Sequence, residues 1–214
     1  TFIGYKSGKG ATTATTAHSN VGVGANALLA ITAGEKNAVL GYDAGKALTT
    51  GTGSTFVGYQ AGESITTGDD NVGNNAAASI QTGAENVVIG FQAAYSNVSS
   101  DQNTIIGYNA AQNMTAGYNT MIGHNAGFDL TTGDYNVLMG VSAGANITGS
   151  QQNVIIGAYA GRMLQASKRL IAIGYEAGYM APTGYQVAIG HAAMRNPTTA
   201  TENMAVGHEA LIGA

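Results

Sequence analysis

One short pattern recurs along the whole chain and restricts what the chain can fold into. It is a glycine that follows a large aliphatic residue and stands three residues before an alanine or a serine, as in residues 103–111. Most intervals between these glycines are about 17 residues, which is typical of a solenoid in which each repeat forms one coil. The thirteen marker glycines are Gly4, Gly24, Gly41, Gly58, Gly73, Gly90, Gly107, Gly123, Gly140, Gly157, Gly174, Gly190 and Gly207.

The two positions before each marker glycine predict a short strand with two apolar faces. The nearer position is always large and aliphatic, and the second is apolar in all repeats but two. Neighbours in a strand point to opposite faces. A solitary solenoid would alternate apolar and polar residues here, so one apolar face needs a cover, and another copy of the chain is the simplest one. We expect Ile106→Asp to collapse the local stack and Gln92→Asp, on a row facing outward, to be nearly silent.

The rest of each repeat is equally regular. An aromatic residue or histidine follows most marker glycines, then come a mostly polar position and a small one, which predicts polar side chains outside and small ones inside. Thr-Thr-Gly, as in residues 49–51, marks a second corner after a leucine or isoleucine directed into the core. Asparagines four residues before the marker predict a hydrogen-bonded ladder of side-chain amides. They are Asn20, Asn37, Asn86, Asn103, Asn119, Asn136, Asn153 and Asn203.

Composition narrows the choice of partners. The repeat runs through the entire chain, so we expect one elongated domain over residues 1–214, about thirteen coils long and part of a longer fibre. Without cysteine the chain has no disulfide or cysteine metal site. No Lys or Arg occurs between Ala47 and Gly161 although seven acidic residues do, so no nucleic-acid partner is predicted. No apolar run approaches the roughly 18 residues of a membrane span, so we expect no membrane insertion.

The repeats resemble those of phage tail-fibre proteins. The shared pattern occurs in residues 37–51 and 119–133. It begins with asparagine, continues with an apolar pair followed by Gly-Tyr or Gly-His, and ends with Thr-Thr-Gly. The strand core in residues 86–90 and 203–207 is also similar to the head repeats of trimeric autotransporter adhesins. Those heads are left-handed parallel β-rolls in which three chains pack side by side. The resemblance therefore implies an all-β parallel β-solenoid or β-roll, here with a repeat of about 17 residues, assembled as a side-by-side homotrimer.

The residue pattern gives little support for a catalytic or metal-binding site. His124, His191 and His208 occupy the aromatic position of their coils, and His124 lies four coils from His191, so we predict no metal site and interpret them as polar substitutes for tyrosine. Asp69 and Asp70 lack a calcium-loop pattern. No serine, histidine and acid form a convergent set, so no catalytic residue, no enzyme activity and no cofactor are predicted.

Candidate receptor contacts lie on positions that vary while the core pattern stays fixed. Five residues after the marker, aromatic side chains at several coils would suit stacking on sugars. The segment from Arg162 to Arg169 departs most in charge from the other repeats. We take the receptor-contact candidates to be Tyr95, Phe128, Arg162, Lys168, Arg169 and Tyr179.

Three functions are compatible with this pattern. The first is a non-enzymatic fibre segment of a phage tail or comparable particle, a rigid spacer that also contacts a glycan or protein of the host surface. The second is the head of a bacterial trimeric surface adhesin. Both are extracellular, on a virion or a cell surface. The third is an ice-binding solenoid, suggested by the Thr-Thr pairs, although residues 81–82, 99–100, 165–166 and 182–183 interrupt the threonine array.

Overall fold

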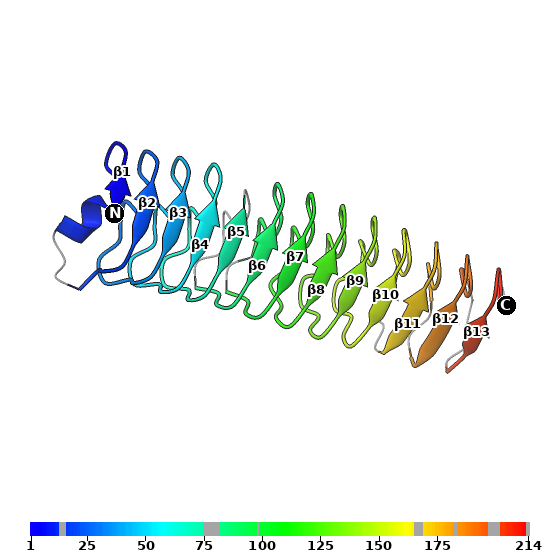
Figure 1. Ribbon diagram of the computed structural model, residues 1–214. Helices are drawn as coiled ribbons and strands as arrows, with labels where there is room; N and C mark the ends of the chain where they lie inside the picture. The colour runs from blue at the N-terminus through cyan, green and yellow to red at the C-terminus, as the bar shows by residue number, and fades with distance from the viewer. Residues whose placement is uncertain are drawn as a thin grey trace. The chain divides into compact units, whose positions relative to one another are not determined.

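The computed structural model describes residues 1–12, 16–74, 82–97, 99–164, 169–181, 184–196 and 202–212. The chain is an all-β parallel β-solenoid with a repeat of about 17 residues per coil, as predicted. It divides into two compact units, Thr1–Asn103 and Thr104–Ala214. Within each unit the strands lie in chain order, each parallel to the next (Figure 1). The first unit holds β1 (Phe2–Ile3), β2 (Val21–Val23), β3 (Ala38–Leu40), β4 (Thr55–Val57), β5 (Val72–Asn74) and β6 (Val87–Ile89). The second holds β7 (Thr104–Ile106), β8 (Thr120–Ile122), β9 (Val137–Met139), β10 (Val154–Ile156), β11 (Leu170–Ile173), β12 (Gln186–Ile189) and β13 (Met204–Val206).

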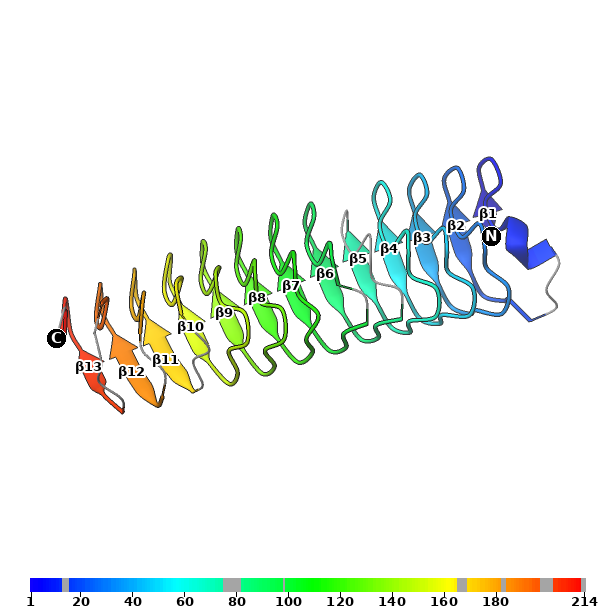
Figure 2. The same cartoon turned by 180° about the vertical axis from the view of Figure 1, so that it is seen from behind.

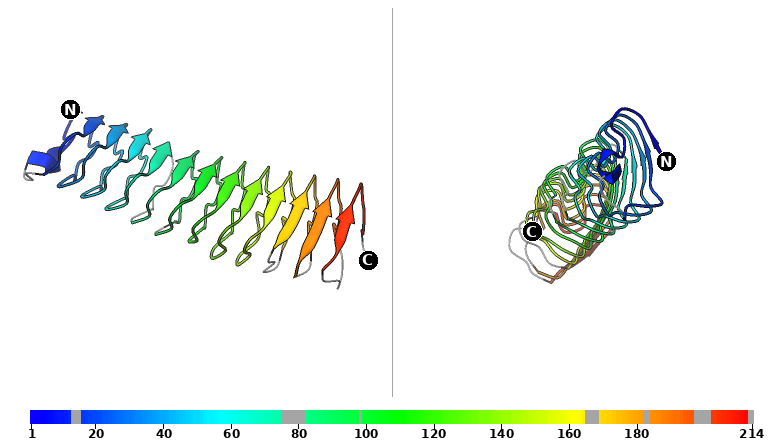
Figure 3. Two further views of the ribbon diagram at one scale, coloured as in Figure 1. Left: turned by 60° about the horizontal axis from the view of Figure 1, so that its bottom comes forward. Right: turned by 90° about the vertical axis from the view of Figure 1, so that its left-hand side faces the viewer.

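Each coil contributes one strand of two to four residues, and turns make up the rest of the winding among the described residues (Figures 2 and 3). Backbone hydrogen bonds continue through these turns, from Gly127 N to Ala143 O at 2.9 Å and from Asp129 N to Ala145 O at 2.8 Å. The turns therefore stack in register as the strands do. A 3₁₀ helix, η1 (Lys9–Thr12), interrupts the first winding. None of the described residues belongs to a helix with the length and hydropathy needed to cross a bilayer.

The interior of the solenoid is lined by the middle residue of each three-residue strand. Phe56, Ile105, Met121, Leu138 and Ile155 are fully buried. The small residue three positions after the marker glycine completes the interior, as predicted, and is fully buried at Ala27, Ala44, Ala61, Ala93, Ala110, Ala126, Ala143, Ala160, Ala177 and Ala193. The core is therefore narrow and filled from both sides of each coil.

The residue directly before the marker glycine faces outward. Leu40 is 51% exposed and Val206 is 62% exposed, whereas Ile106 is half-buried. The prediction that Ile106 supports the stack is therefore corrected, because its neighbour Ile105 is the core side chain. Both rows carry aliphatic residues, so an alternation of period two could not show which one faces inward.

The strand register also corrects one marker. Gly73 pairs with Phe56 and Val88, so it stands in the interior row and not at the turn. The marker position of this coil is therefore two residues later in the sequence than Gly73, outside the described residues. This shift brings Asn71 into the asparagine row, and Asn71 is buried there.

The marker glycines allow neighbouring coils to approach closely. Gly123 has φ +139°, and a Cβ at this residue would lie 2.5 Å from the carbonyl oxygen of Gly140 in the next coil. A side chain would thus be excluded by both the backbone conformation and the space. The predicted need for glycine at this turn is confirmed.

The asparagine ladder forms as predicted. Asn136 accepts hydrogen bonds at Oδ1 from the backbone N and the Nδ2 of Asn153, at 3.1 and 2.8 Å. Its own N and Nδ2 donate to Asn119 Oδ1 at 2.9 and 3.0 Å. Ser54 replaces asparagine in one coil, where it accepts from Asn71 N at 3.2 Å. The ladder thus satisfies buried backbone donors where the chain enters each strand.

The second corner is built as the Thr-Thr-Gly pattern predicts. Leu48, Ile65, Leu130 and Ile147 are fully buried in front of it. The first threonine donates from Oγ1 to a carbonyl of the next coil, as from Thr49 to Thr66 O at 2.9 Å and from Thr131 to Thr148 O at 2.9 Å. These hydroxyls therefore bond along the stack.

Candidate functional site

The outward side of the strands forms an apolar surface in each unit. We call it the outer face, and it comprises the strand residues one and three positions before the marker position. In the second unit these are Thr104, Ile106, Thr120, Ile122, Val137, Met139, Val154, Ile156, Ile171, Ile173, Val187, Ile189, Met204 and Val206. No charged residue occurs among them. Ile171, Ile173 and Met204 are exposed, and Ile122 and Ile156 are half-buried.

A row of aromatic rings borders the outer face, at the position directly after the marker glycine. Tyr42 and Tyr59 stack with ring centroids 5.5 Å apart and an interplanar angle of 8°. In the second unit Tyr108 and His124 stack at 5.3 Å. The rings stack from one coil to the next and lie outside the core. The row therefore extends the apolar outer face.

The predicted receptor contacts fall on different parts of the surface. Tyr95 is exposed in the first unit. In the second unit Phe128, Arg162 and Tyr179 share one row, five residues after their marker glycines, and all three are half-buried. We call this the contact row.

The other two predicted contacts do not belong to the contact row. Arg169 precedes its marker by five residues, donates to Gln152 Oε1 at 2.8 Å and lies over the Tyr185 ring, 5.0 Å from its centroid. Tyr118 and Tyr135 stack on the same row as Arg169, with centroids 5.0 Å apart. Lys168 lies outside the described residues.

A pocket opens on the contact row between Phe128 and Arg162. Its volume is about 220 Å³. The residue between these two side chains on the row is Ala145, whose small side chain leaves the space open. The pocket is lined by Asn125, Phe128, Asp129, Ser142, Ala145, Asn146 and Arg162.

Two polar atoms in the pocket lining are buried without a hydrogen-bond partner in the described residues. They are Asn125 Oδ1, an acceptor, and Arg162 Nε, a donor. The Arg162 guanidinium is held over the Tyr159 ring, 5.4 Å from its centroid. Buried polar groups generally have a partner. Phe128 offers an apolar surface in the same pocket.

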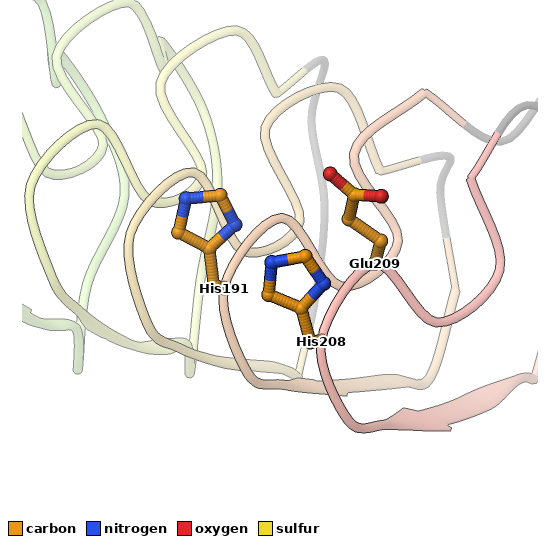
Figure 4. Close-up of side chains that lie close together, drawn as sticks. All are labelled: His191, His208 and Glu209. Atoms are coloured by element: carbon orange, nitrogen blue, oxygen red, sulfur yellow. The ribbon is translucent and has the colours of Figure 1, made fainter.

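The two histidines nearest the C-terminus come together in the second unit. His191 and His208 stack with centroids 4.9 Å apart and an interplanar angle of 9°. One potential ligand atom from each of His191, His208 and Glu209 lies within 4.8 Å of the others (Figure 4). All three side chains are exposed. Imidazole nitrogens and a carboxylate oxygen are ligands for transition metals.

The sequence contained a signal for this cluster. His191 and His208 are separated by one full repeat and occupy the same position within it, directly after the marker glycine. This spacing places His191 and His208 on neighbouring coils, whereas His124 lies four coils from His191. Glu209 could not be assigned to this cluster from the sequence, because its distance from the histidines depends on the turn after β13.

Next to the cluster, Tyr175 stacks on His191 with centroids 5.3 Å apart. The adjacent Glu176 carboxylate raises the pKa of the Tyr175 phenol above its ordinary value, mainly through its negative charge. Glu176 also pairs with Arg195, 2.8 Å from Oε2 to Nε. Arg195 thus pairs with an acidic residue of the preceding coil.

Comparison with known proteins gave no relatives: no family model, no curated protein and no solved structure matches this chain.

Proposed function

We propose that this chain is a non-enzymatic, extracellular fibre segment of a phage tail or comparable particle. In this proposal about thirteen coils form one spacer, and three copies lie side by side along their outer faces. The observation that carries the proposal is the uncharged, apolar outer face of the strands. Soluble monomers rarely expose contiguous apolar patches larger than a few hundred Å².

A second copy of the same chain suits this face better than an unrelated partner does. Its coils have the same spacing, about 4.8 Å between strands, so aliphatic rows of two copies remain matched from coil to coil. A partner without this period would lose register after a few coils. The number three rests on the resemblance to trimeric fibres.

The molar mass of the purified chain in solution tests the assembly. One chain has a mass of 21.5 kDa. We expect light scattering after size-exclusion chromatography to give three times this value, independent of concentration in the micromolar range. A monomer that stays folded and soluble would contradict the proposal.

We further propose that the pocket between Phe128 and Arg162 contacts a host-surface glycan. Support comes from the unpaired donor and acceptor in its lining and from its volume of about 220 Å³. This volume is below the roughly 300–1,000 Å³ of pockets for drug-sized ligands, and therefore suits a single sugar unit.

Saturation-transfer NMR with a panel of methyl pyranosides tests the glycan contact. We expect at least one of them to receive magnetisation from the chain, and Ala145→Phe, which fills the pocket, to abolish the signal. Gln112→Phe places the same ring on the contact row outside the pocket lining and should leave the signal unchanged. Equal signals from both variants would contradict the pocket as the site.

The head of a bacterial surface adhesin is the alternative function, because the same outer face would serve a trimeric head. The two readings differ in the sequence expected outside this segment: a virion-attachment end and a fold-assisting C-terminal segment for the tail fibre, a coiled-coil stalk and membrane anchor for the adhesin. Ice binding is less well supported, since Thr32, Thr49, Thr115 and Thr131 direct their hydroxyls to backbone carbonyls of the next coil.

A further inference from the structure

We infer that His191, His208 and Glu209 form a binding site for a divalent transition-metal ion of the Zn²⁺, Ni²⁺ or Cu²⁺ class. The three side chains come from two neighbouring coils of the second unit, and their ligand atoms lie within 4.8 Å of one another. The site is contained in a single chain. It is therefore independent of the proposed fibre assembly and of the glycan pocket.

The backbone fixes where the three side chains start. β12 and β13 pair in register, with Ile189 opposite Val206, directly before the two turns that carry the histidines. Gly207 N donates to Ile189 O at 2.8 Å, and Glu209 N donates to His191 O at 2.8 Å. The two turns are thus joined on both sides of His208. Folding therefore already brings the three ligands close together, so the free energy of metal binding does not have to offset that entropic cost.

Only side-chain rotation is needed to complete the coordination. Zn–N bonds are about 2.0–2.1 Å long, so two nitrogens on one tetrahedral ion lie roughly 3.3 Å apart. The imidazoles now stand nearly parallel, with centroids 4.9 Å apart. Because both rings and the Glu209 carboxylate are exposed, they can turn toward a common point without displacing core residues. Figure 4 shows the three side chains close together, with His191 on one coil and His208 and Glu209 on the next.

The ligand set selects the class of ion. Two imidazole nitrogens and one carboxylate oxygen favour zinc, nickel and copper over magnesium and calcium, which prefer oxygen ligands alone. Three protein ligands leave at least one coordination position for water. The nearby cation Arg195 is paired with Glu176 and does not take Glu209 as its partner.

Calorimetric titration of ZnCl₂ into the full, untagged chain at neutral pH tests the inference. We expect one ion to bind per chain, and His208→Ala to weaken the affinity at least tenfold. His124→Ala is the matched control, because His124 occupies the same row but stacks on Tyr108 and lies outside the His191, His208 and Glu209 cluster. It should bind zinc as the parent chain does. Circular dichroism of each variant verifies that the fold is retained.

NMR gives a second readout that does not depend on the affinity of a variant. The chain has only four histidines, so their ring signals can be assigned by substitution. Added Co²⁺ should broaden the signals of His191 and His208 first, before those of His18 and His124. Binding to all four histidines alike, or no saturable zinc binding by the folded parent chain, would overturn the inference. Molar mass measured on the same samples reports on assembly separately, so a monomer that binds zinc would contradict only the fibre proposal.

Discussion

At the scale of single residues, the direction of each strand side chain decides its role. Ile105 and Ile106 are chemically alike and adjacent, yet Ile105 is fully buried and Ile106 is half-buried on the outer face. The three-residue strands whose burial is described repeat this division between a core residue and two outer-face residues. The same substitution should therefore have two different consequences at neighbouring positions.

Aspartate at these two positions tests the division. Ile105→Asp places an unpaired carboxylate in the core and should cost more than about 4 kcal/mol of folding free energy. Ile106→Asp can direct its carboxylate to solvent and should retain the fold while weakening association. Urea unfolding followed by circular dichroism measures both. Equal loss of stability in the two variants would contradict the assignment of the rows.

The positions of some residues in the fold could be predicted from the sequence, and those of others could not. The small interior residues, the asparagine ladder and the close approach at the glycines follow from composition at fixed positions of the repeat. The inward row could not be identified, because both faces carry the same residue types. Gly73 was misplaced because Val72-Gly73 imitates the marker, and only strand pairing with Phe56 reveals its position.

At the scale of elements, ladders of side chains connect each coil to the next. The buried asparagine ladder is the most continuous of these. Its members change where the local structure changes, since Ser54 and Gln186 occupy two of the positions and Leu170 a third. Ser54 and Gln186 continue the ladder with other acceptors, whereas Leu170 supplies no side-chain acceptor to the next coil.

Substitution of Asn136 tests the ladder. Asn136→Ala removes the acceptor of Asn153 N and leaves a buried donor unpaired, which should cost about 3 kcal/mol. Asn136→Ser should restore part of this loss, because Ser54 already serves as an acceptor at the same position of its coil. Thermal and urea unfolding of the two variants measure the difference. Identical stability of the alanine and serine variants would show that the acceptor contributes little.

A second ladder of charged groups makes the first unit sensitive to acid. Burial by itself raises the pKa of Asp43, but hydrogen bonds from Lys46 and Asn26 and the charge of Lys46 outweigh it, so that the pKa lies below its ordinary value. Lys46 Nζ lies 2.8 Å from Asp43 Oδ2 and 3.2 Å from Glu63 Oε1. A carboxyl group with a lowered pKa stabilises the fold above its unfolded pKa of about 3.9. That stabilisation is lost as the pH falls through the folded value.

Comparison of the parent chain with Asp43→Asn tests this pH dependence. At pH 7 the parent chain should be the more stable of the two. At pH 3 the difference should narrow, because Asp43 of the unfolded chain then binds a proton while the lowered pKa opposes protonation in the folded chain. Urea midpoints at both pH values provide the measurement. A difference that stays constant between pH 7 and pH 3 would exclude a stabilising charge on Asp43.

At the scale of the whole molecule, the proposed assembly rests on the uncharged outer face. The repeat indicates the solenoid class without any structure, since thirteen markers at nearly constant intervals leave few other architectures. The pocket and the metal ligands needed the structure, because they depend on which side chains of different coils lie next to one another. Their positions in the repeat are visible in sequence, but their contacts are not.

Lysine on the outer face should separate assembly from folding. Ile122→Lys with Ile156→Lys places two charges on this surface without touching the core, and we expect the molar mass to fall from the trimer to the monomer. Circular dichroism should remain that of the parent chain. The matched pair Thr66→Lys with Thr148→Lys, at the second corner and outside the outer face, should leave the molar mass unchanged. Dissociation by both pairs alike would show that charge in general, and not the outer face, controls association.

The stacking of the turns in register has a consequence for how such a chain can change in length. Each residue from Thr120 to Asn136 has a counterpart one winding later, so removing these residues would join Asn119 to Val137 with every row continued. Deleting a single residue within a strand would instead move the remaining side chains of that strand to the opposite surface. The turns accommodate a one-residue difference, because Thr104 pairs with Thr120 after 16 residues and Thr120 pairs with Val137 after 17. The polypeptide can therefore grow or shrink by duplication or excision of entire windings, whereas differences of a single residue are confined to the turns.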